Sequence, residues 1–321
     1  MKKLPPKLDL GQLRLNSLFT RVSKVNRADF ARPYKINSSF RRFCDRLPNI
    51  LAAGDLKTAA ALFADARLDG QSTMLAMGGH PIKVGLGPLI VDLLAKGLFD
   101  CVSANGSVMV HDLEIALAGA TSEDADQSLK DGAFGVTGET GAMINRAARV
   151  ASETGQGLGQ TLGRLINELK PPGVKDSVLA AAARLGVPFT IHVAMGTDVY
   201  HIHPDRDFSQ LGRATQTDFE TFCQWVAILE DGVFLNLGSA VIMPEVFLKA
   251  ITLVRNLGFP LRNLTTINMD FLHQYRSRVN VVERPTKEGG QGFYFIGHHE
   301  IMFPLLMGLI IEDLAYPDDF I

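Results

Sequence analysis

The feature that most constrains the fold of this 321-residue chain is a local order that recurs along it. A short apolar segment with the length of a buried strand is followed by a glycine-bearing or polar loop, and then by apolar residues at helical spacing. Segments of this kind occupy residues 73–77, 100–104, 189–194 and 233–237. Because strands that alternate with helices form parallel pairs, the pattern predicts an α/β fold with a mainly parallel sheet and helices on both faces.

Helical patterns surround these strands. A core-facing helix is expected over residues 55–66, with Gly70 as its stop signal. The almost unbroken apolar run over residues 301–311 is about half the length that spans a bilayer and contains Pro304. It therefore predicts a buried helix and no membrane segment. The other helices are expected to reach about residue 96, to cover residues 107–117, and to start at Thr215 or Thr217 and at Pro244.

The domain organisation follows from where this order begins. Residues 1–38 mix prolines, basic residues and isolated apolar residues without a sustained period, which predicts an arm that lies over the body or over a neighbouring subunit. Residues 39–321 are expected to form a single α/β domain. Within it, residues 119–175 break the rhythm and are interpreted as an insertion.

Composition excludes several classes of protein. The net charge is −2 and the basic residues are scattered, so the chain lacks the basic stripe that nucleic acid requires. Its three cysteines, Cys44, Cys101 and Cys223, are far apart and odd in number, which indicates neither a disulfide framework nor a structural zinc site. No apolar stretch at the start is suited to a signal peptide. We expect a cytoplasmic protein.

The loops that follow the predicted strands carry the residues suited to ligand binding. Ligands of parallel sheets bind at the carboxyl ends of the strands, and glycines let the backbone approach them closely. The spacing of these glycines matches neither the GxGxxG nor the Walker pattern. The expected ligand contacts are Gly78, Gly79, His80 and Lys83 after the first strand, Asn105 and Gly106 after the second, and Gly238 and Ser239 after the fourth.

Histidines and an aspartate follow the third predicted strand. His201 and His203 are two residues apart, so in an extended segment they point the same way, and Asp198 lies close to the strand end. This pattern suits an acid–base group with an orienting carboxylate. It also leaves open a metal site, for which a third ligand would have to come from His80, His111 or Asp198. The structural alternative is one buried histidine with satisfied hydrogen bonds and one loop contact.

Several stretches, in order from about residue 73 to the C-terminus, resemble the deoxyhypusine synthase family. That family uses NAD to cleave spermidine and transfers the aminobutyl group to a lysine of a translation factor. The resemblance implies a Rossmann-like nucleotide-binding architecture, an NAD cofactor, a histidine at the position of His203 in the active site, and subunits that assemble as a homotetramer or dimer. The matching stretches are residues 85–94, 99–103, 112–113, 177–182, 187–189, 232–241 and 303–306, with Asp198 and His203.

The chain departs from that family at the catalytic position. Met243 stands where the family has the lysine that forms the imine, and a thioether cannot form one. Lys249 lies six residues further along the expected helix, on another face, and is expected to be a solvated surface lysine. The family's acidic, tryptophan-bearing polyamine segment is also missing, since Arg284 and Lys287 bring positive charge to the aligned region.

Three functions remain open on these grounds. The first is a divergent NAD-binding enzyme that acts on an amine or amino-acid-like small molecule and is not a true deoxyhypusine synthase. In it His203 is the acid–base residue, with Asp198 and His201 beside it. The second is a metal-dependent hydrolase or isomerase that uses the histidines. The third is a catalytically silent oligomeric scaffold, because a fold does not guarantee activity.

Overall fold

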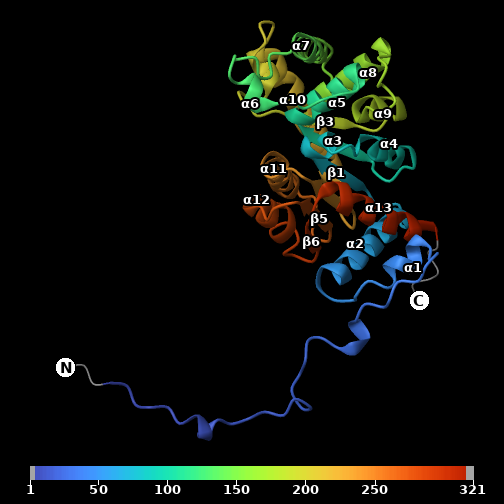
Figure 1. Ribbon diagram of the computed structural model, residues 1–321. Coiled ribbons are helices and arrows are strands. Elements are labelled where there is room, and N and C mark those ends of the chain that lie inside the picture. The colour runs from blue at the N-terminus through green and yellow to red at the C-terminus, as the bar shows by residue number, and fades with distance from the viewer. Residues whose placement is uncertain (1–3, 316–321) are drawn as a thin grey trace. The chain divides into compact units, whose positions relative to one another are not determined.

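A parallel sheet of six strands forms the centre of the computed structural model, which describes residues 4–315 (Figure 1). The strand order across the sheet is β3-β2-β1-β4-β5-β6. The chain therefore starts in the middle, builds outward to β3, returns to the middle at β4, and builds outward again to β6. The strands are β1 (Thr73–Met77), β2 (Cys101–Asn105), β3 (Phe189–His192), β4 (Val233–Leu237), β5 (Thr265–Asp270) and β6 (Gln291–Ile296).

The strand order is the Rossmann order, in which the direction of building reverses between β1 and β4. Every residue of β1 and of β4 is buried, because helices cover both faces of these central strands. β6, at the edge, alternates between exposed and buried residues. The expected α/β fold with a parallel sheet and helices on both faces is confirmed.

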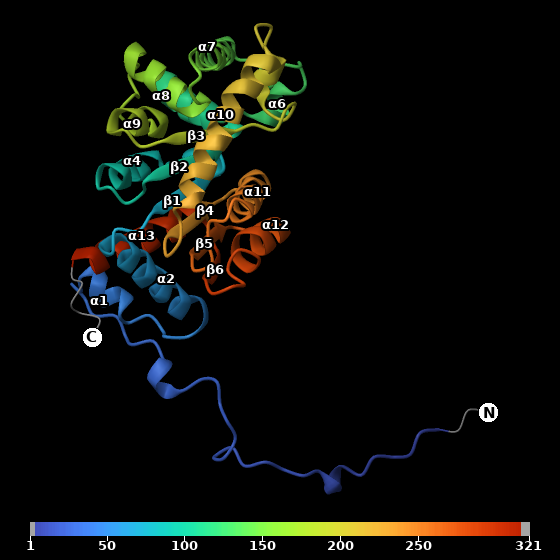
Figure 2. The ribbon, with the colours of Figure 1, turned by 180° about the vertical axis from the view of Figure 1, so that it is seen from behind.

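The helices fall into two groups around the sheet. In both views α11 and α12 lie on one side of the strands, and α2, α4 and α13 lie on the other (Figures 1 and 2). Side chains of α10 and α11 form one apolar core with Met74, Cys101 and Phe234 of the strands. The helices are α2 (Leu51–Leu68), α3 (His80–Lys83), α4 (Gly87–Ala95), α5 (Gly106–Ala118), α6 (Ala125–Ser128), α7 (Gly138–Thr154), α8 (Leu158–Leu169), α9 (Val178–Leu185), η3 (Val199–Ile202), α10 (Phe208–Ala227), α11 (Ile242–Asn256), α12 (Tyr275–Ser277), η4 (Arg278–Glu283) and α13 (His299–Ala315).

Most of the expected elements are present, but one helix start was misplaced and two strands were missed. The helix expected to start at Thr215 or Thr217 begins at Phe208. Asp207 caps it, since the Asp207 carboxylate accepts hydrogen bonds from the backbone N–H groups of Ser209 and Gln210. The apolar run that predicted a buried helix is α13. The pattern analysis missed β5 and β6.

The chain divides into two compact units, the first ending at Gly54 and the second beginning at Asp55. The first unit holds the short helices η1 (Leu10–Gln12), η2 (Arg27–Asp29) and α1 (Phe40–Cys44). Its large apolar side chains are mostly exposed, from Leu4 to Ile36, so this stretch has no core of its own. A separate finding is that none of the helices within residues 4–315 has the length and apolarity of a membrane span.

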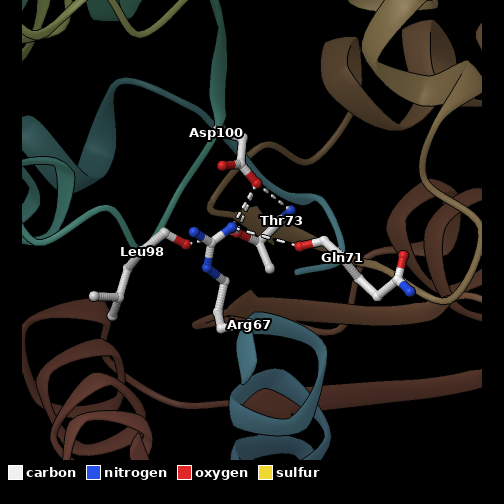
Figure 3. A network of polar contacts seen from close by, with 5 residues as sticks. All are labelled: Arg67, Gln71, Thr73, Leu98 and Asp100. Carbon is white, nitrogen blue, oxygen red and sulfur yellow. Dashed lines mark hydrogen bonds and ion pairs between the residues drawn. The ribbon is translucent and has the colours of Figure 1, made fainter. Parts of the chain in front are cut away.

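A network of polar contacts fixes β1 at its amino end (Figure 3). Arg67 Nη1 donates to Asp100 Oδ2 at 2.6 Å, and the Thr73 backbone N–H donates to the same oxygen at 2.9 Å. The Thr73 hydroxyl donates to the Leu98 carbonyl oxygen at 2.6 Å. These contacts join the start of β1 to the residues just before β2, so they hold the register of the two strands.

We expect Asp100→Ala to destabilise the protein by about 2 kcal/mol, because it leaves the Thr73 N–H and the Arg67 guanidinium without their acceptor. Urea unfolding followed by circular dichroism measures this. The matched control is Asp92→Ala, which removes a carboxylate paired with Lys96 on the surface of α4, and which should change stability by less than about 0.5 kcal/mol. Equal effects of the two substitutions would contradict this role of Asp100.

Candidate functional site

A cavity of about 1250 Å³ lies along α5 and reaches the segments that follow β1, β2 and β3. Lys83 of α3, Ser107 at the start of α5, and Asp198 of the loop after β3 lie on its wall. The opposite wall comes from α7 and from the segment between α5 and α7, including Phe134 and Thr140. The cavity is larger than the usual pocket for a single small molecule, so it has room for a nucleotide or for two ligands side by side.

A carboxylate held by three polar side chains lies in the cavity wall. The Thr121 hydroxyl donates to Glu114 Oε2, the Thr140 hydroxyl lies 3.4 Å from Glu114 Oε1, and His111 Nδ1 lies 2.7 Å from the Thr121 oxygen. Burial acts to raise the pKa of Glu114, but the hydrogen bonds from His111, Thr121 and Thr140 outweigh it and lower that pKa. Glu114 is therefore a carboxylate at neutral pH.

The pKa of Asp198 is shifted in the opposite direction from that of Glu114. Burial raises its pKa to about 6, and the hydrogen bond from the Tyr200 hydroxyl, at 3.2 Å, only partly opposes this. The carboxylate lies against Gly106, where an added Cβ would come within 2.0 Å of Asp198 Oδ2. Only glycine at position 106 leaves room for the carboxylate. A carboxyl group with a pKa near neutrality can both accept and donate a proton at physiological pH.

Charges of both signs surround the cavity. Lys83 and Arg146 supply positive charge, and Glu114, Glu139 and Asp198 supply carboxyl groups. The apolar part of the lining comes from α5, α7 and the segment between them, for example Val110, Leu117, Phe134 and Met143. A cavity of this kind suits a ligand that combines a carboxylate, an ammonium group and an apolar portion.

The structure brings only some of the sequence-predicted residues to this cavity. Lys83 and Asp198 line it. Gly79 lies just behind the wall, since an added Cβ there would meet Ser107 Oγ at 2.6 Å, and Asn105 Oδ1 accepts a hydrogen bond from the same hydroxyl. The sequence analysis missed Glu114, Thr121, Thr140 and Arg146. The spacing of His111 and Glu114 on α5 was the one available signal for the first of these.

The two histidines of the loop after β3 shape the loop itself. His201 Nδ1 accepts hydrogen bonds from the backbone N–H groups of Gly196 and Asp198, at 3.2 and 3.1 Å. His203 Nδ1 accepts from the Asp205 N–H, and the His203 ring lies against Gly141 of α7. Neither imidazole is part of the cavity wall. His203 and His80 nevertheless lie at the same edge of the sheet.

The other predicted residues gather at the point where the strand order reverses. Gly78 and Gly238 follow β1 and β4, and an added Cβ at Gly78 would lie 2.3 Å from the Gly238 carbonyl oxygen. The Ser239 hydroxyl accepts a hydrogen bond from the Met243 N–H and so caps α11. The His80 ring lies 5.1 Å from the rings of both Phe271 and His299. These residues lie outside the cavity wall.

Met243 lies in the apolar core beneath α11, among residues such as Phe222, Phe234 and Phe247. Its side chain is fully buried, so position 243 does not face the cavity. Lys249 is exposed and pairs with Glu245 at 3.3 Å, as expected of a surface lysine. Among residues 4–315, no three histidine, cysteine, aspartate or glutamate side chains lie close enough together to hold a metal ion.

The fold and the cavity together define the class of this protein as a parallel α/β protein of Rossmann strand order with a polar site at the carboxyl edge. No family model matches the sequence, and no curated protein matches it. Solved structures do match the fold. A candidate deoxyhypusine synthase from Entamoeba histolytica matches with a TM-score of 0.53 and 11% identity, over 88% of this chain and 96% of that one.

Two larger proteins share the fold with similar scores. The complex of AgrE with ornithine and NAD+ matches with a TM-score of 0.51 and 15% identity, over 81% of this chain and 33% of AgrE. The arginine dihydrolase ArgZ from the ornithine–ammonia cycle in cyanobacteria matches with a TM-score of 0.50 and 14% identity, over 82% of this chain and 33% of ArgZ. This chain therefore spans about a third of the length of each. At these identities the likeness shows the fold alone.

We expect the stability of the wild type relative to Asp198→Asn to fall as pH rises from about 4 to about 7. The pKa of Asp198 is raised to about 6 in the folded protein from an ordinary 3.8, so the folded chain holds a proton that the unfolded chain releases. Ionising this buried carboxyl should cost the wild type about 1–2 kcal/mol, which Asp198→Asn avoids. Urea unfolding across this pH range measures the difference.

Tyr200→Phe is the second variant of this test, because it removes the hydroxyl that donates to Asp198. Without that donor the folded-state pKa of Asp198 rises further, so the pH range over which the difference develops should extend upward and the full difference should increase. A difference between the wild type and Asp198→Asn that is independent of pH would contradict the raised pKa.

Proposed function

We propose that this protein is an NAD-binding enzyme that acts on an amino-acid-like substrate. The observation that carries the proposal is the cavity of about 1250 Å³ with charges of both signs, at the carboxyl edge of a sheet of Rossmann order. Dinucleotides bind at this edge, across the reversal point between β1 and β4. That AgrE was solved with ornithine and NAD+ on a similar fold supports the same pairing of cofactor and substrate class.

The residues of the cavity divide into two roles in this proposal. Lys83 and Arg146 bind the carboxylate of the substrate, and the anionic Glu114 binds its ammonium group. Asp198 takes the acid–base role, because it lines the cavity and its pKa is about 6. His201 and His203 hold the loop that positions Asp198.

NAD would lie over the strand ends that carry Gly78, Gly79, Asn105, Gly106, Gly238 and Ser239, with His80 beside them. Bound NAD+ would accept a hydride from the substrate. The protein groups at this edge fit a polar ligand, since the imidazole of the buried His299, next to Gly238, has no hydrogen-bond partner among residues 4–315 apart from the Met269 backbone. Lysine–imine chemistry is not part of the proposal, because Met243 and Lys249 lie away from the cavity.

The proposal predicts that NAD+ binds the purified, nucleotide-free protein with a Kd below about 1 mM and raises its Tm. Isothermal titration calorimetry and thermal unfolding measure the two effects. In the presence of NAD+, ornithine is the probe for the substrate. Lys83→Ala should weaken ornithine binding about tenfold or more, because it removes a charge that pairs with the carboxylate.

Lys249→Ala is the matched control, since Lys249 is an equally exposed lysine that lies away from the cavity. It should leave the binding of both probes unchanged. Failure of 1 mM NAD+ to produce either heat or a change in Tm would refute the proposed cofactor.

We also propose that the chain is a homodimer or homotetramer. The exposed apolar side chains from Leu4 to Ile36 have no core of their own, and burying them against a second copy would stabilise an assembly. Light scattering at micromolar concentration should give twice or four times the mass of the chain. Removal of residues 1–38 should shift the assembly toward the monomer. A strictly monomeric full-length chain would contradict this.

A further inference from the structure

A cluster of three rings lies at the reversal point of the sheet, apart from the cavity. His80 follows β1, Phe271 follows β5, and His299 is the first residue of α13, directly after β6. Their ring centroids are 5.1, 5.1 and 5.7 Å apart. Three segments that are far apart in the sequence therefore place aromatic rings at one point, where the segment after β1 meets the segments after β5 and β6.

His299 is the unusual member of this cluster. Its side chain has no exposed surface, and apart from the Met269 backbone its ring nitrogens have no hydrogen-bond partner among the described residues. Burying a polar group without a partner destabilises a fold by a few kcal/mol, and most buried polar groups are therefore paired. Packing does not offset this cost, because an apolar ring of similar size would make the same van der Waals contacts without burying a polar group.

The backbone next to His299 is built around its ring. Gly238 has a φ of +67°, and an added Cβ there would lie 2.6 Å from His299 Cε1. Only glycine combines this backbone conformation with space for the imidazole. Gly238, which contacts the His299 ring, follows β4, and His80 follows β1. The rings of His299 and His80 therefore lie on the two sides of the point where the strand order reverses.

The charge state of His299 defines what it can bind. Burial lowers its pKa, and the nearby His80 acts in the same direction, while Asp270, a hydrogen bond with the Met269 backbone, and Glu300 act to raise it. A neutral imidazole has one N–H donor and one nitrogen acceptor. Its complement is a planar group that offers an acceptor and a donor, such as a ring amide or an aminopyrimidine edge.

We propose that His80, Phe271 and His299 form the subsite for one heterocyclic ring of the dinucleotide, either the adenine or the nicotinamide. This inference rests on the proposed function. A Rossmann sheet has two mononucleotide-binding halves, and the cavity lies on the half formed by β1, β2 and β3. The ring cluster is the corresponding place on the half formed by β4, β5 and β6. Both rings of NAD carry the donor and acceptor that His299 lacks.

Phe271 covers His299. Its ring is 42% exposed, and it contacts both imidazoles from the loop after β5. A ligand ring of similar size that displaces the Phe271 side chain would keep the stacking contacts with His80 and His299. It would also supply the hydrogen bonds that a phenyl ring cannot. This exchange explains how a buried imidazole becomes accessible to a ligand.

The test is His299→Phe, which keeps the ring volume and removes both nitrogens. It should weaken NAD+ binding about tenfold, the scale of a lost hydrogen bond to a ligand, while Tm stays the same or rises. Loss of a purely structural residue would lower Tm and leave the Kd unchanged. His298→Phe is the matched control, because the neighbouring His298 is exposed and faces Glu300. It should alter neither quantity.

A second pair of variants tests the ring contacts. Phe271→Ala opens the cluster and should lower the Kd for NAD+ at least threefold, since the ligand no longer has to displace the phenyl ring. Phe259→Ala is the control, because Phe259 is exposed to a similar degree, 44%, in the loop before β5 at the other end of the sheet. It should have no effect on the Kd.

Titration with AMP and with nicotinamide mononucleotide separates the two rings. The mononucleotide whose affinity falls in His299→Phe is the one bound at the cluster. If NAD+ binds the wild type, and His299→Phe binds NAD+ and both mononucleotides with unchanged affinity, the subsite is refuted while the NAD-binding function stands. If NAD+ does not bind the wild type at all, the proposed function and this inference fall together.

Discussion

The pairing of β1 with β2 on one side and β4 on the other is the constraint on which the rest of the structure depends. All residues of β1 are buried, so the strand is held by backbone pairing on both edges and by apolar contacts on both faces. The network of Arg67, Thr73 and Asp100 fixes its amino end. With the amino end held, the carboxyl ends of β1, β2 and β4 lie side by side, and their loops are forced to share one edge of the sheet.

That shared edge explains why small residues follow the strands. Gly78 and Gly238 contact each other through the backbone, and Gly106 lies directly against the carboxylate of Asp198. A side chain at any of these positions would push the loops apart. The edge is thereby divided into two regions, the cavity beside β1, β2 and β3, and the ring cluster beside β4, β5 and β6.

Three buried aspartates, Asp112, Asp218 and Asp198, differ in what their carboxyl groups contact. Asp112 and Asp218 accept backbone hydrogen bonds, from Val178 and Leu179 and from Gly159 and Ile191, and so join helices and β3 to one another. Burial raises their pKa to about 6 and about 8. Asp198 has a similar shift but fewer protein donors, and it faces a cavity. The free capacity for a hydrogen bond, and not the pKa shift alone, distinguishes it as a functional group.

The sequence by itself determined the alternation of strands and helices, the glycine loops at the strand ends, the apolar α13 and the presence of a methionine at position 243. These depend on local spacing and residue type, which a single stretch of chain contains. The tertiary structure decided the strand order and which residues form each site. It also decided the presence of β5 and β6, because their polar or half-exposed residues gave no strand signal. Glu114 meets Thr140, and His80 meets Phe271 and His299, only because the sheet brings distant segments together. Lys83 and Asp198 were predicted because each lies in the segment that follows a strand, whereas contacts across the fold depend on packing distances that no local pattern encodes.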